Sequence, residues 1–448
     1  MRKIWILLVT FSSLWAQGEN LRLSVPYQQY KLDNGLNVIL HQDSSTPTVS
    51  VNVWYHVGSG REKPGRTGFA HLFEHIMFEG SQHVPEGMFD RWLEAAGGDN
   101  NGSTTSDRTN YWENIPKNAL ELALFLESDR MGYLLEAMNP DVVEGQRNVV
   151  KNERRQSYEN RPYGMAFITL FENLYPANHP YHWPTIGSMQ DLDAASYEDV
   201  VNFFQSYYGP NNASLAIAGD IDIDTTRLLV EKWFGAISAG PPVPPQAPPA
   251  AFLIESKEIV LEDKVQLPRI YLAWHSPSYY HPGDAECDVL SSVLSDGKNS
   301  RLYKRLVYDL QIAQDVYAYQ YSRDLGSSFI IQSTARPGIK LDSLLSVIDL
   351  ELAKIQSHPP TNREVQRSVN QIQANFLRRI ENIGGFGGKA DQLNNYYFFT
   401  GNPDYFQEDL SRYTALDPVD IQAIARQVLT PNRVVLSIVP EEKRELAK

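Results

Sequence analysis

Two histidines and a glutamate in one short segment are the residues of this sequence best suited to chemistry. They form the pentad His71-Leu-Phe-Glu-His75. In a helix, side chains three and four positions apart share one face, so both imidazoles can reach one metal ion. Neutral imidazole is a favoured zinc ligand, and Glu74 would stand beside the open coordination position. The competing interpretation is a chance string, or a helix with buried core histidines. Because only 10 of 448 residues are histidine, a chance match is a roughly one-in-a-hundred event.

A catalytic zinc site needs a third protein ligand, which a later helix can supply. The best candidate helix begins at Asn139 and Pro140, a favourable pair of cap and first-turn residues. On this helix Gln146 and Glu153 share one face, and Glu144 is a rival on a different face. A glutamate in a charged helix is usually exposed to solvent, so periodicity alone does not choose the ligand.

An internal duplication organises the chain. Residues 196–218 and 417–439 match without a gap at an offset of 221, and each predicts a capped helix, a Pro-Asn turn and a buried strand. Residues 51–56 and 270–275 match at an offset of 219 as a further strand in each half. The chain is therefore expected to contain two copies of one domain.

The expected fold class is α+β, with two homologous domains that each pack a mainly antiparallel sheet against helices. We expect a first domain over residues 17–239 and a second over 251–448. Residues 240–250 are too rich in proline for a helix or a central strand and predict a stiff linker. At the offset of 219, the pentad side chains His71, Glu74 and His75 fall opposite Leu290, Val293 and Leu294. One zinc ion per chain is therefore expected, in the first domain.

The first residues and the composition indicate an exported protein. Residues 1–16 predict a secretory signal peptide, with Arg2 and Lys3 before a short apolar run. That run is too short to span a membrane, and no later stretch is long enough. The single thiol, Cys287, excludes an internal disulfide, and a soluble periplasmic protein fits best. The net charge of −14, or −16 once Arg2 and Lys3 are removed, argues against nucleic acid as a partner.

Two further motifs favour structure over chemistry. Residues 384–388, Gly-Gly-Phe-Gly-Gly, lack the lysine and hydroxyl ending of a phosphate-binding loop. They predict a hinge or a close approach of the backbone to another segment. His179 and His182 have a possible ligand spacing, but Pro180 between them and the lack of a nearby acid favour a structured loop.

Several longer stretches carry a family resemblance: 68–80 around the pentad, 97–98, 101–109, 147–153, 208–211 and 300–303. Through them the chain resembles the M16 zinc metallopeptidases, the pitrilysin-type enzymes with an inverted zinc motif. It is most similar to their processing-peptidase-like bacterial branch of two-domain subunits, and the resemblance covers nearly all of the mature chain. The resemblance implies that Glu153 is the third zinc ligand.

The resemblance also implies a role for Asn101, Gly102, Ser103 and Thr104. From the residues alone, 100–103 predict a polar turn. The family places here an edge strand that takes up the substrate peptide as an additional strand, so that main-chain bonds give affinity with little side-chain preference. Gly102 stands where the family usually has alanine, a small change that should still allow close approach of the backbone.

Three positions depart from the family pattern. Gln146 stands where a second glutamate is common, so it can form a hydrogen bond but adds no charge. Active members also carry an arginine and a tyrosine, in the second domain or in a partner, that hold the substrate carbonyl and its developing oxyanion. Here the aligned positions are Val307 and Gln314, which cannot stabilise that charge. A frame shift would be needed to recruit Tyr303, Arg305 or Tyr308.

These features together imply metal-assisted hydrolysis of unfolded oligopeptides. Zinc on His71, His75 and Glu153 would polarise the scissile carbonyl, and Glu74 would move a proton from water to the leaving amine. The implied partners are a peptide substrate and a related subunit that supplies the missing arginine and tyrosine. Two alternatives remain open: a non-catalytic scaffold or peptide-binding subunit, and a self-sufficient homodimeric peptidase.

Overall fold

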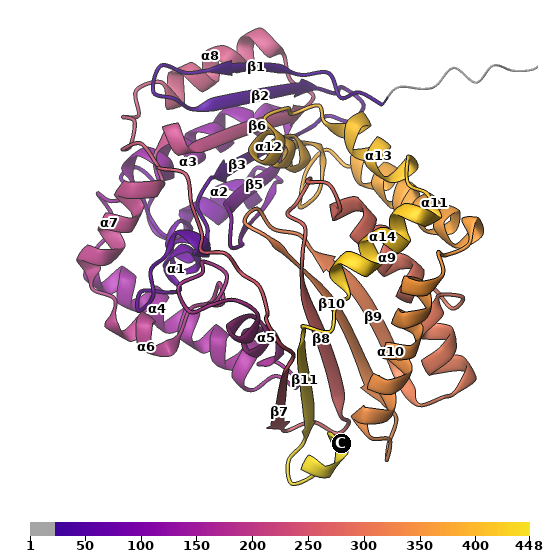
Figure 1. Ribbon diagram of the computed structural model, residues 1–448. Helices are drawn as coiled ribbons and strands as arrows, with labels where there is room; N and C mark the ends of the chain where they lie inside the picture. The colour runs from indigo at the N-terminus through magenta and orange to yellow at the C-terminus, as the bar shows by residue number, and fades with distance from the viewer. Residues whose placement is uncertain (1–22) are drawn as a thin grey trace, which may run out of the picture.

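Two β-sheets covered by helices form the protein, as the computed structural model in Figure 1 shows. It describes residues 23–448, so the expected signal peptide, 1–16, lies outside the described residues. The first sheet has six strands in the spatial order β1-β2-β6-β3-β5-β4. Their bounds are β1 Gln28–Lys31, β2 Asn37–Gln42, β3 Thr48–Tyr55, β4 Asp99–Thr104, β5 Thr109–Pro116 and β6 Ala213–Gly219.

The second sheet repeats the first without its outermost strand. Its five strands follow the order β7-β11-β8-β10-β9. Only β2 with β6 and β7 with β11 run parallel, and every other neighbouring pair is antiparallel. The expected α+β duplication is therefore present in the strand order itself. The bounds are β7 Lys257–Asp263, β8 Arg269–Ser276, β9 Ala313–Tyr321, β10 Ser327–Ala335 and β11 Val434–Pro440.

Within residues 23–448, the first half has eight α-helices and the second half has six. In the first half they are α1 Phe69–Ile76, α2 Met88–Ala95, α3 Leu120–Tyr133, α4 Pro140–Arg154, α5 Ala166–Leu174, α6 Met189–Ala194, α7 Tyr197–Tyr207 and α8 Ile223–Phe234. In the second half they are α9 Asp284–Ser295, α10 Leu341–Ser357, α11 Asn362–Ile380, α12 Lys389–Thr400, α13 Phe406–Thr414 and α14 Pro418–Val428. The matched segments of the sequence become α7 followed by β6 and α14 followed by β11, which confirms that prediction.

Each sheet is covered on one face by a helix from the other half of the chain. Helix α5 packs on β8 and β11, where Leu170 joins a buried cluster with Leu436 of the second sheet. Helix α12 packs on β2, β3 and β6, where Leu393 joins a cluster with Ile39 of the first sheet. At the offset of 221, α5 begins opposite residue 387, two positions before α12, so the two exchanged helices are repeats of each other. The two halves therefore share their cores instead of meeting only at a linker.

The proline-rich segment 240–250 has no helix or strand and runs along the first half. Gly240 N–H donates to the side chain of Asn211, and the side chain of Arg61 donates to the carbonyl of Pro244. The segment is thus held against the first half along part of its length.

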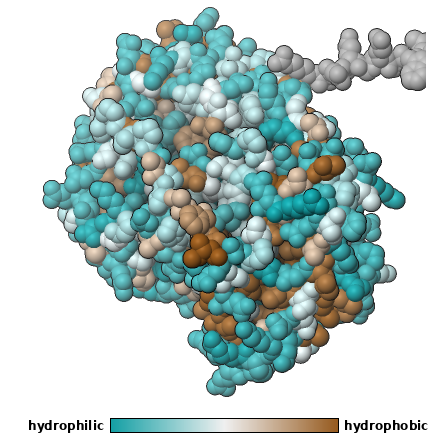
Figure 2. Space-filling model, in the orientation of Figure 1, coloured by the Kyte–Doolittle hydropathy of each residue, from teal (hydrophilic) through white to brown (hydrophobic). Residues whose placement is uncertain are grey.

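The surface of the molecule is mixed in character. The face in Figure 2 is mostly hydrophilic, and hydrophobic groups gather in its lower half, which Figure 1 shows to be the region of the second sheet. Within residues 23–448, no helix combines the length and the apolar character that a membrane crossing requires.

Candidate metal centre

Helix α1 carries the pentad and is buried on one side in the core of the first half. Leu72, Phe73 and Ile76 are completely buried in the core of the first half. The two histidines project from the opposite side, where the side chain of His71 is 13% exposed and that of His75 is 26% exposed. An apolar stripe on one side of the helix therefore fixes the direction of the imidazoles.

The start of α1 is held by a buried acid that sequence reasoning missed. Glu62 is 6% exposed and accepts hydrogen bonds from the backbone N–H groups of Gly68 and Ala70, at 2.9 and 2.8 Å. These N–H groups have no partner within the helix, so the side-chain oxygens of Glu62 satisfy them. Burial raises the pKa of this carboxyl group to about 8. Glu62 lies too far before the helix to resemble a local cap, and the sequence therefore gives no signal for it.

Helix α4 supplies the third side chain and begins where the sequence predicts. The side chain of Asn139 accepts hydrogen bonds from the N–H groups of Asp141 and Val142, at 3.0 and 3.1 Å, and Pro140 occupies the first turn. The α-helix ends at Arg154 and continues as a wider turn over Arg155–Glu159. Since α4 packs against α1, its last turn brings Glu153 to the histidines.

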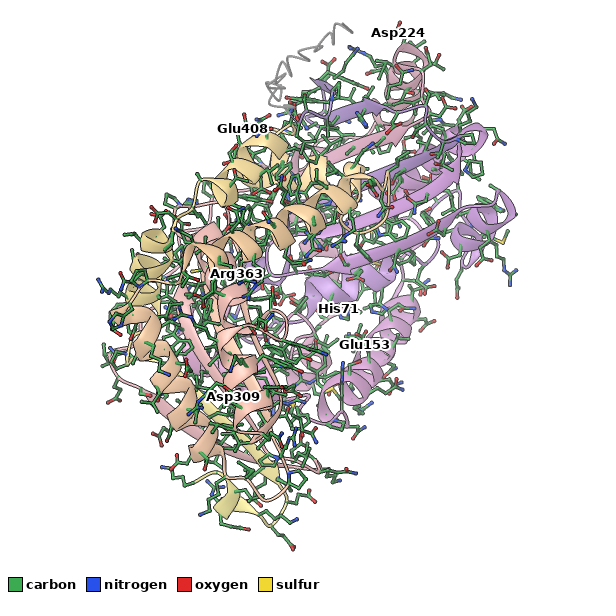
Figure 3. The ribbon with its side chains drawn as sticks, turned by 90° about the vertical axis from the view of Figure 1, so that its right-hand side faces the viewer. His71, Glu153, Asp224, Asp309, Arg363 and Glu408 are labelled. Atoms are coloured by element: carbon green, nitrogen blue, oxygen red, sulfur yellow. The ribbon has the colours of Figure 1, made fainter. Side chains whose placement is uncertain are left out.

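The three side chains converge on one point. The Nε2 atoms of His71 and His75 lie 3.6 and 3.3 Å from the same oxygen, Oε2 of Glu153. Ligand atoms bound at about 2.0–2.1 Å to a tetrahedral zinc ion are about 3.3–3.4 Å apart. Within residues 23–448, this is the one group of three or more His, Cys, Asp and Glu side chains placed to share an ion. Figure 3 labels His71 and Glu153 on their neighbouring helices.

The charges of the site suit a cation. Burial lowers the pKa of His71 to about 4, so its imidazole is neutral at pH 7. The hydrogen bond with His75 lowers the pKa of Glu153, which keeps the carboxylate ionised. Neutral imidazole and ionised carboxylate are the forms that bind zinc, so the residues present fit this metal.

Within residues 23–448, Gln146 forms no hydrogen bond with the three ligand candidates. Its side-chain amide donates to the carboxylate of Glu79. This agrees with the expectation that Gln146 can bond to a neighbouring group. The Nδ1 atom of His71 is buried and has no hydrogen-bond partner within residues 23–448, so no carboxylate there orients that ring.

Glu74 reaches from α1 to the edge of the first sheet. Its Oε2 accepts a hydrogen bond of 2.6 Å from the hydroxyl of Thr104, and burial raises the pKa of its carboxyl group. Thr104 ends β4, which is the last strand in the order of the sheet and has only β5 as a neighbour. Residues 100–103 are thus part of an edge strand, and the polar turn predicted from the residues alone is wrong.

The register of β4 with β5 determines which main-chain groups of β4 face away from the sheet. Thr105 N–H donates to the carbonyl of Arg108 at 2.8 Å and closes the hairpin between β4 and β5. Because inward and outward main-chain groups alternate along such a pair, Gly102 and Thr104 point their N–H and C=O groups away from β5. Asn101 currently accepts the Gly102 N–H with its side-chain oxygen, at 2.8 Å.

Glycine at position 102 fits more tightly than the sequence implies. A Cβ atom there would lie 3.1 Å from ring atoms of both Phe78 and Tyr111. An alanine at this position would therefore require these two rings to move by a few tenths of an ångström.

The second half carries the counterpart of this site with other residues. Leu290, Val293 and Leu294 are fully buried, so the correspondence with the pentad at an offset of 219 is wrong. The pattern of burial agrees better at an offset of 217, which brings Asp288, Ser291 and Ser292 to the positions of the pentad side chains; of these three only Ser292 is buried. The reason is that the connection from β8 to α9 is shorter than that from β3 to α1.

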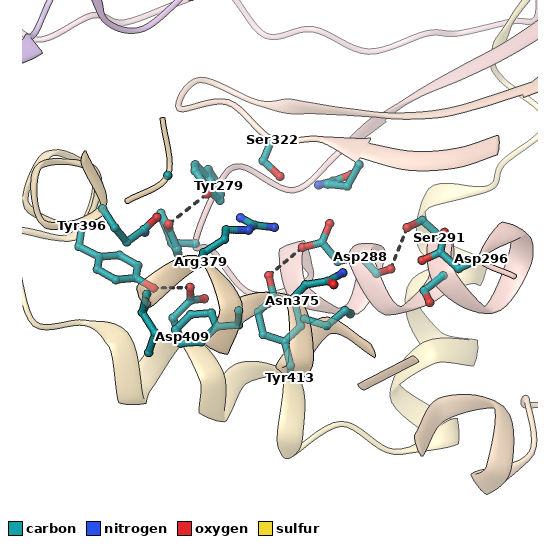
Figure 4. Close-up of a pocket in the computed structure, with 18 residues that line it drawn as sticks. Tyr279, Asp288, Ser291, Asp296, Ser322, Asn375, Arg379, Tyr396, Asp409 and Tyr413 are labelled. Carbon is teal, nitrogen blue, oxygen red and sulfur yellow. Dashed lines mark hydrogen bonds between the residues drawn. The ribbon is translucent and has the colours of Figure 1, made fainter. Parts of the chain in front are cut away.

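This side of α9 lines a cavity of about 450 Å³, which Figure 4 shows together with Asn375 and Arg379 from α11. Helices α9 and α11 pack against each other as α1 and α4 do. No histidine lines the cavity.

The positions expected to hold the family's arginine and tyrosine lie in the second half. Val307 is part of the helical turn Tyr303–Asp309 and packs against the core of that half, and Gln314 is exposed on β9. The loop with His179 and His182 is structured, as predicted: His179 is buried and its Nδ1 accepts the backbone N–H of Tyr181.

Known proteins resemble this chain over most of its length. A family model described as insulinase (peptidase family M16) matches residues 37–179, and one described as peptidase M16 inactive domain matches 194–372. The zinc protease PqqE of Helicobacter pylori is 30% identical over 375 residues, which cover 82% of this chain and 83% of that protein. The uncharacterized zinc protease YmxG of Bacillus subtilis is 23% identical, over 92% of this chain and 98% of that protein.

Solved structures agree with these matches. The crystal structure of a protease from Helicobacter pylori superposes with a TM-score of 0.85 at 26% identity, covering 93% of this chain and 100% of that chain. The first half of the periplasmic protease PqqL from Escherichia coli shares the fold, with a TM-score of 0.75 at 18% identity over 94% of this chain and 93% of that chain. This chain belongs to the M16 family of peptidases, and its named relatives are zinc proteases.

Proposed function

We propose that this chain is the zinc-bearing subunit of an exported metalloendopeptidase that hydrolyses unfolded oligopeptides. The observation that carries the proposal is the convergence of His71, His75 and Glu153 beside Glu74 and the free edge of β4. Ligand candidates, a carboxylate base and a strand edge for a peptide thus lie within one site.

Zinc bound by His71, His75 and Glu153 would supply Lewis acidity to the scissile carbonyl and to the attacking water. Glu74 would take the proton of that water and deliver it to the leaving amine. The hydroxyl of Thr104 holds one carboxylate oxygen of Glu74, which leaves the other oxygen free to receive the proton.

The peptide would lie along β4. Gly102 and Thr104 offer outward main-chain groups, and an extended peptide can add to them as a further strand. For this to happen, the side chain of Asn101 must release the N–H of Gly102. Asn101, Gly102, Ser103 and Thr104 are thus the proposed substrate-binding residues, and their main chain is expected to favour unfolded segments of any sequence.

A homologous subunit would complete the site. Val307 and Gln314 cannot hold a developing oxyanion, so an arginine and a tyrosine must come from elsewhere. This chain superposes on 49% of the full PqqL chain, with a TM-score of 0.76. The rest of PqqL is therefore long enough to form a second region of the same size within one polypeptide. PqqL is described as periplasmic, and residues 1–16 of this chain support the same location.

The test is hydrolysis of a quenched-peptide library by the purified zinc-loaded chain, alone and mixed with a homologous subunit that carries the arginine and tyrosine. We expect one zinc per chain, hydrolysis only in the mixture, and loss of hydrolysis but not of zinc in Glu74→Gln. Activity of the chain alone would favour the homodimeric peptidase. A folded chain that takes up no zinc would refute the proposal and favour a scaffold.

A further inference from the structure

A carboxylate of the second half is buried against the strands that carry the peptide edge. Asp391, in the first turn of α12, is 9% exposed. Its Oδ1 accepts hydrogen bonds from Trp54 Nε1 on β3, at 2.8 Å, and from Asn110 Nδ2 on β5, at 3.1 Å. Its Oδ2 accepts the backbone N–H of Gly387, at 2.8 Å. The three hydrogen bonds that Asp391 accepts therefore join α12 to the first sheet and to the glycine loop that precedes α12.

Further side-chain hydrogen bonds link Asn110 on β5 to Ser103 on β4, and Ser103 to the hairpin residue Arg108. Ser103 Oγ donates to Asn110 Oδ1 at 2.6 Å. Arg108 Nη1 donates both to Ser103 Oγ, at 2.6 Å, and to the carbonyl oxygen of Ser103, at 2.8 Å. Each group in the series Arg108, Ser103, Asn110, Asp391 donates to the next, and such chains strengthen their members. Ser103, the second member of this series, directly precedes Thr104, which holds Glu74.

The glycine loop 384–388 allows this contact. A Cβ atom on Gly384 would collide with Asn114 Oδ1 and lie 2.6 Å from Ser50 Oγ, so any larger residue would force these two side chains of the first sheet to move. The sequence predicted a hinge or a close backbone approach for this loop, and the structure confirms the close approach. The loop then directs the N–H of Gly387 to Asp391.

We propose that Asp391 is a positioning residue for the peptide-binding edge. An edge strand has one neighbour only, and β4 must keep a fixed place while a peptide joins its free side. Asp391 holds β4 through Asn110 and Ser103 at the position where Thr104 meets Glu74. This role rests on the proposed function of β4. In this way the second half of the chain, which lacks the metal ligands, helps to fix the position of the peptide-binding strand.

The same helix offers a matched control. Asn394, one turn further along α12, is fully buried and donates to the carbonyl and the side-chain oxygen of Asn52 on β3, both at 2.9 Å. Neither bond leads to β4. Loss of Asn394 should therefore weaken the packing of α12 on the sheet as loss of Asp391 does, without releasing the edge strand.

The first experiment measures hydrogen exchange in the segment 99–108 of the zinc-loaded full chain. We expect exchange to become roughly tenfold faster in Asp391→Ala, because a hydrogen bond to a charged group is lost. Ser103→Ala interrupts the same series between Arg108 and Asn110 and should act alike, whereas Asn394→Ala should leave this segment within twofold of the unchanged chain. Equal exchange in Asp391→Ala and Asn394→Ala would overturn the proposal. If Asp391→Ala does not fold, Ser103→Ala against Asn394→Ala carries the same test, and equal exchange in these two variants would overturn the proposal.

The second experiment measures binding of a fluorescent unfolded peptide in the Glu74→Gln background, where hydrolysis does not interfere. We expect the Kd to rise about tenfold in Asp391→Ala and to stay within twofold in Asn394→Ala. An equal Kd in both variants would refute positioning. If no variant binds peptide while the exchange pattern holds, the proposed function of β4 fails and the anchoring of the strand by Asp391 stands.

Discussion

Removing one leucine from α12 should weaken the first sheet, although this helix belongs to the second half of the sequence. Leu393 is completely buried and lies in a cluster with Ile39, Ala216 and Ala218 of β2 and β6. Leu393→Ala deletes a buried isobutyl group and leaves a cavity in that cluster. Such changes cost about 2–5 kcal/mol, and full burial places this one near 3 kcal/mol.

Leu352→Ala is the matched comparison. Leu352, on α10, is 4% exposed and lies in the core on the other face of the second sheet, formed by the second half alone. We expect both variants to lower the free energy of unfolding in urea by similar amounts. Hydrogen exchange should separate them: exchange in β2 and β6 through local opening should increase more in Leu393→Ala than in Leu352→Ala.

One pattern of hydrogen exchange would contradict a core shared between α12 and the first sheet. If Leu393→Ala accelerates exchange in β8, β10 and β11 but not in β2 and β6, then α12 does not complete the core of the first sheet. A single cooperative transition in both variants, with equal midpoints by fluorescence and circular dichroism, would agree with shared cores.

Three other changes give further tests. Glu153→Gln keeps the size of the side chain but removes the anionic ligand, so the zinc Kd from chelator competition should rise at least about tenfold, and an unchanged Kd would exclude Glu153 as a ligand. Burial beside Asp284 raises the pKa of Asp288 to about 7. Between about pH 4 and pH 7 the folded chain therefore keeps a proton that the unfolded chain releases, and stability falls as pH rises through this window. Asp288→Asn lacks this penalty and should be more stable by an amount on the order of 2 kcal/mol at pH 8, with little difference at pH 4, in urea unfolding at both values. Gly384→Ala places a Cβ atom against Asn114 and should lower the melting temperature, whereas Gly385→Ala, which has open space around its Cβ but a positive φ, should lower it less.

Much of the site follows from local sequence patterns. The spacing of His71, Glu74 and His75 predicts a shared helix face because helical geometry is local, and Asn139 marks the start of α4 for the same reason. The choice of Glu153 came from the family resemblance, since periodicity left Glu144 open. The structure supports the choice through the approach of Glu153 to both imidazoles.

Other features depend on contacts between distant segments. Asn-Asn-Gly-Ser has poor strand propensity, and residues 100–103 become a strand because β5 pairs with them. The shift between α1 and α9 arises in a connection whose length no local pattern reveals. Glu62 and Asp391 reach their partners through the tertiary fold, and nothing in their sequence neighbourhoods distinguishes them from other acids.

The exchange of α5 and α12 sets the order of events during synthesis. The last strand of the first sheet ends at Gly219, but its covering helix ends at Thr400. At about 5–20 residues per second, a ribosome needs roughly 10–40 s to make the chain between these points. During that time the nascent first half lacks the helix that covers this apolar sheet face in the folded chain. Folding to the native state must therefore wait until nearly the whole chain has been made. Until then, the uncovered apolar face of the first sheet is a surface that a chaperone for unfinished chains could bind.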